Sequence, residues 1–205
     1  VILAVLDTGI DQDLSDFAGR IVSPYSAVDR SSSWPTWCDN NGHGTFVTGV
    51  AAAQGNDGQG MAGTAWNVKI MPVKIADQTQ ADASTLADGI YWAVAHGADV
   101  INISWATQSL ASVLRDAITY AVQQGVVVTG AAGNDSLGQV SYPAAFSGVL
   151  AVGSLTWTPS DTRADFSNTG SALDLMAPGM KIFSRGKDSN GNWTWMFMQG
   201  TSFST

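Results

Sequence analysis

The sequence contains no glutamate, one cysteine and only two histidines, and each shortage narrows the range of functions. All 17 acidic residues are aspartates, and they outnumber the nine lysines and arginines to give a net charge of −8. Because the basic residues are few and do not cluster, we expect no nucleic-acid partner. The acidic surface favours solubility, and it also offers oxygen ligands to a hard cation.

Cysteine and long apolar runs are equally scarce. Cys38 is the only cysteine, so the chain cannot form an internal disulfide. We interpret Cys38 as a free thiol; a disulfide to a residue outside this sequence is the alternative. The sequence has no run of 18 apolar residues and no signal peptide, so we expect neither a transmembrane helix nor a membrane partner.

The residues that are present fit a compact α/β protein, since 45% are hydrophobic and 22 of the 205 are glycines. Apolar runs predict buried strands at residues 1–6, 68–75, 100–104, 126–131 and 149–153. Helices are predicted at residues 47–54, 84–96 and 110–123, with Ser84 capping the second and Val113 on the buried face of the third. Residues 23–42 and 154–172 are polar and are predicted to be surface loops.

Alternating strands and helices predict a mostly parallel sheet with helices on both faces. In such sheets, ligands bind beyond the carboxyl ends of the strands. Asp7 follows the first predicted strand and Asn134 follows the strand at 126–131, so both are expected near a site.

Three short motifs, far apart in the chain, contain the residues of a possible catalytic triad. They are VLDTGID around Asp7, NGHGTFVTG around His43 and GTSFST around Ser202. A carboxylate, an imidazole and a hydroxyl can form an activated nucleophile if the fold brings them together. Taken singly, each has an ordinary interpretation: Asp7 as a turn residue, His43 as a loop residue and Ser202 as a helix N-cap. The other histidine, His96, precedes a glycine at a predicted helix end, which leaves His43 as the candidate general base.

The order Asp, His, Ser is that of subtilisin, and further segments point the same way. AAGND around Asn134, DVINIS at 99–104, SYPAAF at 141–146 and DLMAPG at 174–179 occur in subtilase order. The chain therefore resembles the subtilase family of serine endopeptidases over nearly its whole length. The resemblance implies a subtilisin-like α/β fold, truncated at both ends, with residues 1–205 forming a catalytic domain that lacks the part after the nucleophile. It also implies a secreted, monomeric enzyme that cleaves proteins or peptides and is made as a larger precursor.

The resemblance assigns roles to the motif residues. Asp7 orients His43, His43 takes the proton of Ser202, and the Asn134 side chain with the Ser202 N–H stabilises the oxyanion. Activity is expected to rise with pH as His43 loses its proton near an ordinary pKa of about 6.5.

Ten residues are assigned to substrate binding by the same resemblance. They are the edge segment Ala81, Asp82 and Ala83, the pocket walls Ser104, Trp105, Ala106, Ala131, Ala132 and Gly133, and the pocket floor Ser141. The family often has glycine at the positions of Ala81, Ala106 and Ser141. The added side-chain atoms should narrow the pockets, which predicts a preference for small or medium apolar residues before the scissile bond.

The chain differs from the usual family pattern at two further positions, and the resemblance also implies a metal site. Phe46 replaces a second histidine, without an evident role, and Phe203 replaces the methionine that usually follows the nucleophile. The family often binds calcium near the loop after the His helix, and the matching residues here are Asp16, Asn56 and Asp57. Hard cations prefer such oxygen ligands, although a Gly/Asn/Asp loop is also typical of a plain turn.

Two other functions remain as alternatives. A dinucleotide-binding enzyme could use a similar sheet, but no G-x-G-x-x-G follows the first strand, which argues against it. A catalytically silent, subtilase-like binding module is the second alternative. The presence of all four catalytic residue types, Asp7, His43, Asn134 and Ser202, favours the enzyme.

Overall fold

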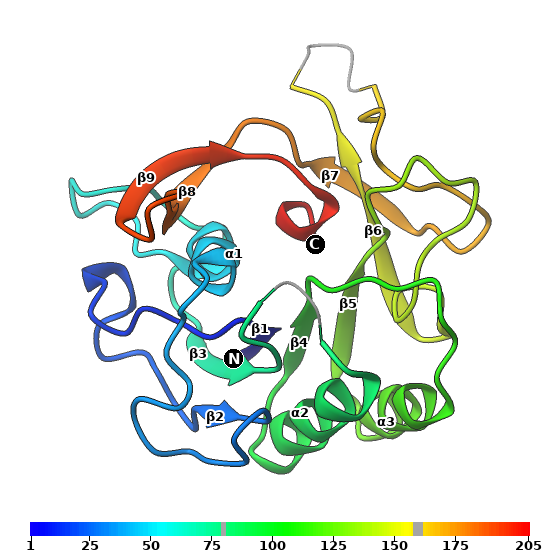
Figure 1. The fold of residues 1–205 in the computed structure, drawn as a ribbon, viewed down its shortest axis with the longest axis horizontal. Helices are drawn as coiled ribbons and strands as arrows, with labels where there is room; N and C mark the ends of the chain where they lie inside the picture. The colour runs from blue at the N-terminus through cyan, green and yellow to red at the C-terminus, as the bar shows by residue number, and fades with distance from the viewer. Residues whose placement is uncertain (79–80, 158–161) are drawn as a thin grey trace.

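The computed structural model describes residues 1–78, 81–157 and 162–205. Within these ranges, a seven-stranded parallel sheet with the order β2-β3-β1-β4-β5-β6-β7 forms the centre of the protein (Figure 1). Its strands are β1 (Ile2–Asp7), β2 (Tyr25–Ser26), β3 (Lys69–Lys74), β4 (Val100–Ile103), β5 (Val127–Ala131), β6 (Val149–Leu155) and β7 (Leu175–Pro178).

Helices cover both faces of this sheet, as the sequence predicts. On one face lies α1 (His43–Ala52), packed against an antiparallel ribbon of β8 (Ile182–Lys187) and β9 (Trp193–Met198). On the other face lie α2 (Ala83–Ala95) and α3 (Ser112–Gln123), together at the bottom of Figure 1. None of the helices in the described ranges is long and apolar enough to cross a membrane.

Strand β1 contributes side chains to the hydrophobic cores on both faces of the sheet. Successive side chains of a strand point to opposite faces. Ala4 and Leu6 join the core under α2 and α3, whereas Leu3 and Val5 contact the cluster formed with α1. A strand buried on both faces must be apolar throughout, which explains the uninterrupted hydrophobic run at the start of the chain.

Three details of the predicted helices are wrong. Helix α1 begins at His43 and not at residue 47, because side chains outside it accept the backbone N–H groups of its first turn: Asn41 that of His43, Thr8 that of Gly44 and Asp39 that of Thr45. Helix α2 begins at Ala83, so Ser84 is not its N-cap. Val113 is 44% exposed, because α3 buries the stripe formed by Leu114, Ala117, Ile118 and Ala121.

The sequence prediction also missed β2, β7 and both strands of the ribbon. Strand β2 lies in the predicted surface loop 23–42, and that segment also buries Trp37 and Asp39. The predicted loop 154–172 contains the buried Ser167 and Asn168; its residues 158–161 lie outside the described ranges. These segments are polar yet partly buried, because their side chains find hydrogen-bond partners in distant parts of the chain.

The carboxyl ends of β1, β4 and β5 are adjacent, because these strands are neighbours in the sheet. Asp7 is the last residue of β1, Ser104 follows β4, and Asn134 comes shortly after β5. A parallel sheet brings such residues to one edge. The fold therefore positions three segments of the predicted site beside one another.

Candidate active site

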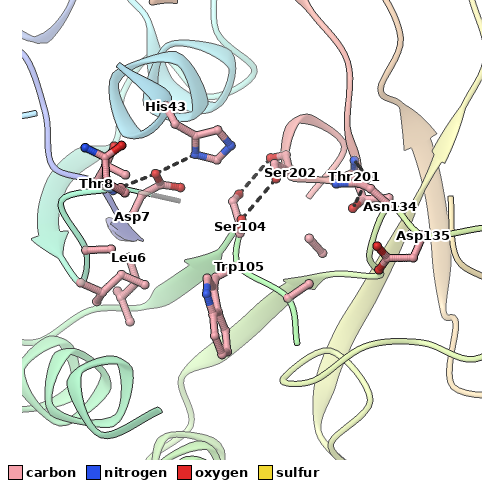
Figure 2. A pocket seen from close by; sticks show the side chains of 15 residues that line it. Leu6, Asp7, Thr8, His43, Ser104, Trp105, Asn134, Asp135, Thr201 and Ser202 are labelled. Carbon is pink, nitrogen blue, oxygen red and sulfur yellow. Dashed lines mark hydrogen bonds and ion pairs between the residues drawn. The ribbon is translucent and has the colours of Figure 1, made fainter. Parts of the chain in front are cut away.

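Asp7 and His43 form a direct hydrogen bond. The Nδ1 atom of His43 lies 2.7 Å from Oδ1 of Asp7, and the backbone N–H of Thr8 donates to the same oxygen at 2.8 Å. Asp7 is 5% exposed, so its interaction with the ring is little screened by water. In Figure 2 the His43 ring lies between Asp7 and Ser202. The arrangement holds the proton on Nδ1 and leaves Nε2 free to act as a base.

The pKa of His43 is raised above its ordinary value. Burial of the ring opposes this shift, but the charge of Asp7, the hydrogen bond to Asp7 and the charge of Asp39 together outweigh it. A base must be neutral to accept a proton, so activity that depends on His43 should be lost as the pH falls through this raised pKa. The sequence-based expectation of a midpoint near 6.5 is therefore too low.

Ser202 lies in η2 (Thr201–Phe203), a single 3₁₀ turn, and is 9% exposed. Its hydroxyl donates to the carbonyl oxygen of Ser104 at 3.2 Å, while Ser104 Oγ donates to the carbonyl oxygen of Ser202 at 2.9 Å. In the described part of the chain, no hydrogen bond joins Ser202 to His43. Catalytic hydrogen bonds are often absent or long before substrate binds, so this resting geometry is compatible with a triad.

Asn134 is held in a fixed orientation beside Ser202. Its Oδ1 accepts from the backbone N–H of Thr201 at 2.8 Å and from Thr201 Oγ1 at 3.0 Å. Because the oxygen is occupied, the amide Nδ2 is the free end of the side chain. Neither Asn134 Nδ2 nor the backbone N–H of Ser202 has a hydrogen-bond partner among the described residues. Two free donors therefore border the same pocket, which is the requirement of an oxyanion hole.

The pocket has a volume of about 280 Å³ and is lined by Asp7, His43, Ser202 and Asn134, among others. Of the ten predicted substrate-binding residues, four line it: Ser104, Trp105, Ala106 and Ala131. Ala132, Gly133 and Ser141 are buried beside it, and Ala81, Asp82 and Ala83 lie at the start of α2 next to residues outside the described ranges.

The position of Ser141 depends on two residues that sequence reasoning missed. Ser141 is 1% exposed, and its hydroxyl accepts hydrogen bonds from Asn168 Nδ2 at 3.0 Å and Gln108 Nε2 at 2.7 Å. Asn168 also donates to the carbonyl oxygen of Ala132 at 3.1 Å. Nothing in the sequence near Asn168 or Gln108 signals these contacts, because both residues are far from Ser141 in the chain.

Phe46 and Phe203, the two departures from the family pattern, are in contact. Their ring centroids lie 4.6 Å apart, and the Phe203 ring lies 5.5 Å from the ring of His43. Phe46 is fully buried and Phe203 is 5% exposed. The contact gives Phe46 a role that the sequence did not reveal: it supports Phe203, which packs on the ring of His43.

We expect Phe203 to make the protein resistant to peroxide. Methionine next to a nucleophile is oxidised to a polar sulfoxide, whereas phenylalanine has no such reaction. Wild type should retain its activity in peroxide, and Phe203→Met should lose it. Residual activity after timed exposure measures the effect. Equal rates of inactivation in the two proteins would show that another residue, such as Cys38 or Met198, governs sensitivity.

The residues of the predicted calcium site lie near one another without forming a complete ligand set. Asp16, in η1 (Ser15–Phe17), is 2% exposed, and its Oδ1 has no hydrogen-bond partner in the described ranges. Burial, and then the charge of Asp57, raise the pKa of Asp16 above its ordinary value. Asn56 and Asp57 are exposed in the loop after α1. In the part of the chain that the structure describes, no three acidic, histidine or cysteine side chains cluster as metal ligands.

Comparisons with known proteins agree with the fold. The model of the Subtilase family matches residues 1–205. The chain is 38% identical over 204 residues to a thermophilic serine proteinase of Bacillus sp. strain AK1, covering 99% of this chain and 49% of that protein. It is 44% identical over 207 residues to the cell wall-associated protease of Bacillus subtilis, covering 100% of this chain and 22% of that protein.

A solved structure of a protease from Pseudoalteromonas arctica superposes with a TM-score of 0.88 at 30% identity, covering 100% of this chain and 74% of that one. The fold is thus that of the subtilisin-like α/β proteins. The chain belongs to the subtilase family, and it spans half or less of the length of the two curated relatives.

Proposed function

We propose that this protein is a serine endopeptidase that hydrolyses peptide bonds in proteins through an acyl-enzyme on Ser202. The observation that carries the proposal is the 2.7 Å bond between Asp7 and His43 in a pocket that Ser202 also lines. Membership of the subtilase family supports the same reaction.

The reaction begins when Ser202 Oγ leaves its hydrogen bond to Ser104 and turns toward His43. Nε2 of His43 takes the hydroxyl proton as the oxygen attacks the substrate carbonyl, and Asp7 stabilises the resulting imidazolium. Asn134 Nδ2 and the Ser202 N–H donate to the oxyanion. The imidazolium then protonates the leaving amine, and water, activated by the same histidine, hydrolyses the acyl-enzyme.

The substrate is an extended peptide whose side chain before the scissile bond enters between two walls. One wall is Ser104, Trp105 and Ala106, and the other is Ala131, Ala132 and Gly133, above the Ser141 floor. The segment Ala81, Asp82 and Ala83 pairs with the substrate backbone. We infer a preference for small or medium apolar residues, since the hydroxyl of Ser141 is held in place by Asn168 and Gln108.

Release of new peptide termini from an unfolded protein tests this function. Wild type should cut casein internally, and mass spectrometry should find the new N- and C-termini; Ser202→Ala should produce none. Binding of casein without cleavage would favour the alternative, a catalytically silent binding module. We also infer secretion, on the basis of relatives whose names describe extracellular or cell-wall proteases.

We further propose a structural calcium ion near Asp16, with Asn56, Asp57 and loop carbonyl oxygens as ligands. The residues fit a hard cation in one respect. The buried Oδ1 of Asp16 has no hydrogen-bond partner among the described residues, and the negative charge of Asp57 acts on the same carboxylate. A bound cation would relieve their repulsion and join the loop after α1 to η1.

Calcium should raise the melting temperature of the protein relative to a chelator. At 100 times its Kd, the ion would stabilise the fold by about 2.7 kcal/mol, or roughly 5–10 °C for a chain of this size. Asp16→Asn should abolish this difference, whereas Asp13→Asn, an exposed neighbour, should keep it. Identical melting curves of wild type in calcium and in chelator would contradict the site.

A further inference from the structure

Asp39 places a buried carboxylate in the loop that leads into α1. Its side chain is 0% exposed, and five donors reach it. Oδ1 accepts from Thr8 Oγ1 at 2.9 Å and from the backbone N–H groups of Asn41 at 3.0 Å and Gly42 at 2.7 Å. Oδ2 accepts from the backbone N–H and the hydroxyl of Thr45 at 2.9 and 2.7 Å. A carboxylate is stable in the interior only when such donors replace its lost water.

The donors come from the two segments that carry the Asp–His pair. Thr8 directly follows Asp7, and Thr45 lies in the first turn of α1, which His43 begins. One side chain, Asp39, therefore contacts the loop after β1 and the start of α1 at the same time.

Two more hydrogen bonds join the loop after β1 directly to the first turn of α1. The backbone N–H of Gly44 donates to Thr8 Oγ1 at 2.9 Å, and that of Asp11 donates to Thr45 Oγ1 at 2.9 Å. Each threonine hydroxyl thus donates to Asp39 and accepts from the opposite segment. Because every one of these groups is buried, removing one partner leaves others unsatisfied.

We propose that Asp39 is a positioning residue of the triad, an inference that rests on the peptidase function proposed above. Its carboxylate holds the first turn of α1 against the residue after Asp7 and so fixes the approach of His43 Nδ1 to the Asp7 carboxylate. The N-cap residue of α1 is Gly42, which has no side chain to cap the helix. Asp39 instead accepts the backbone N–H of Thr45, next to Asn41 and Thr8, which accept those of His43 and Gly44. The negative charge of Asp39 also favours the helix N-terminus.

The charge of Asp39 affects a measurable property, the pKa of His43. Together with Asp7, it opposes the effect of burial and raises the pKa of His43. Other charged groups also lie near the loop and the pocket. Asp135 is on the pocket wall, and Asp11 pairs with Arg185 beside Thr45. Lys74 and Lys187 donate to the backbone carbonyls of Cys38 and Asn40, which flank Asp39. Neutralising Asp39 should therefore lower the pKa of His43, whereas a change that only loosens packing should not.

The variant Asp39→Asn tests the proposal. Asparagine has the same shape as aspartate but only one acceptor oxygen. Either the donors to Oδ1 or the donors to Oδ2 must therefore face its NH2 group, which cannot accept their hydrogen bonds. We expect kcat to fall about 10²-fold through misplacement of His43, with KM changed less than about twofold. NMR titration should show His43 losing its proton at lower pH than in wild type. His96, the other histidine of the chain, serves as the internal reference.

Two further variants separate charge from geometry. Thr8→Val keeps the Asp39 charge, so kcat should fall roughly tenfold with no change in the His43 titration; this variant also serves if Asp39→Asn does not fold. Asp188→Asn alters a half-buried aspartate that accepts two backbone hydrogen bonds in the β8–β9 turn and should leave kcat unchanged. A folded Asp39→Asn with wild-type kcat and His43 titration would overturn the proposal, as would wild-type kcat in Thr8→Val. Absence of peptidase activity in wild type would instead refute the proposed function, because the NMR titration reads His43 without turnover.

Discussion

Replacing Ser202, His43 or Asp7 by alanine is expected to lower kcat by about 10⁴- to 10⁶-fold, the range known for subtilisin, a member of the same family. The physical reason is that the three side chains act as one unit. Without His43 the Ser202 hydroxyl has no base, and without Asp7 the His43 ring loses the 2.7 Å bond that fixes its tautomer. Rates measured on a chromogenic peptide, with KM and kcat determined separately, give the effect.

The losses should not add. The double variant Ser202→Ala/His43→Ala should be no slower than either single variant, because each removal already disables the proton transfer. His96→Ala is the matched control, since His96 stacks on Trp92 at the end of α2, away from the pocket. If His43→Ala kept most of the wild-type rate, the assignment of the base would be wrong.

The second largest effect is expected at Asn134. Asn134→Ala removes a proposed oxyanion donor and should lower kcat by about 10²- to 10³-fold, again the range known for subtilisin. KM should change little, because the donor acts on the charge that develops in the transition state. Steady-state kinetics on the same peptide measure the changes in kcat and KM separately.

Control variants distinguish this role from a structural one. Asn190→Ala changes an exposed asparagine in the β8–β9 turn and should retain full activity. Thr201→Val removes one of the two hydrogen bonds that orient Asn134 and should show an intermediate loss of kcat. An Asn134→Ala variant with higher KM but unchanged kcat would indicate a ground-state contact and would contradict the oxyanion role.

The sequence was sufficient to predict five of the seven strands of the sheet and to place Asp7 and Asn134 at one edge of it, because both depend on local signals. Strand β1 is an apolar run that ends at Asp7, and the run at 126–131 similarly ends close before Asn134. Such runs identify buried strands, and the alternation with helices fixes a parallel topology. The residues at the strand ends then had to share one edge of the sheet.

Elements that depend on distant partners could not be predicted. The ribbon of β8 and β9 lies over α1, and its position is set by contacts such as that of Ser184 Oγ with the carbonyl oxygen of Phe46 at 3.0 Å. Strand β2 has two residues and exists only through its pairing with β3. Neither has a periodicity long enough to be recognised from sequence.

Asp39 shows the same limit within the site. In the stretch CDNNGH, an aspartate is typical of a turn, and its sequence environment does not reveal that it is fully buried. The burial depends on donors from Thr8 and Thr45, which reach Asp39 only after β1 and α1 have packed together. The resting hydrogen bond of Ser202 to Ser104 is likewise a property of the folded chain, since 98 residues separate the two partners.

The central claim, that Ser202 is an activated nucleophile, is tested most directly by labelling with a fluorophosphonate. Only a serine whose proton is taken by a base reacts readily with this probe. Wild type should be labelled at one site, and peptide mapping should locate the label on Ser202; His43→Ala should react far more slowly. A protein that remains unlabelled, or that carries the label on another serine, would contradict the account.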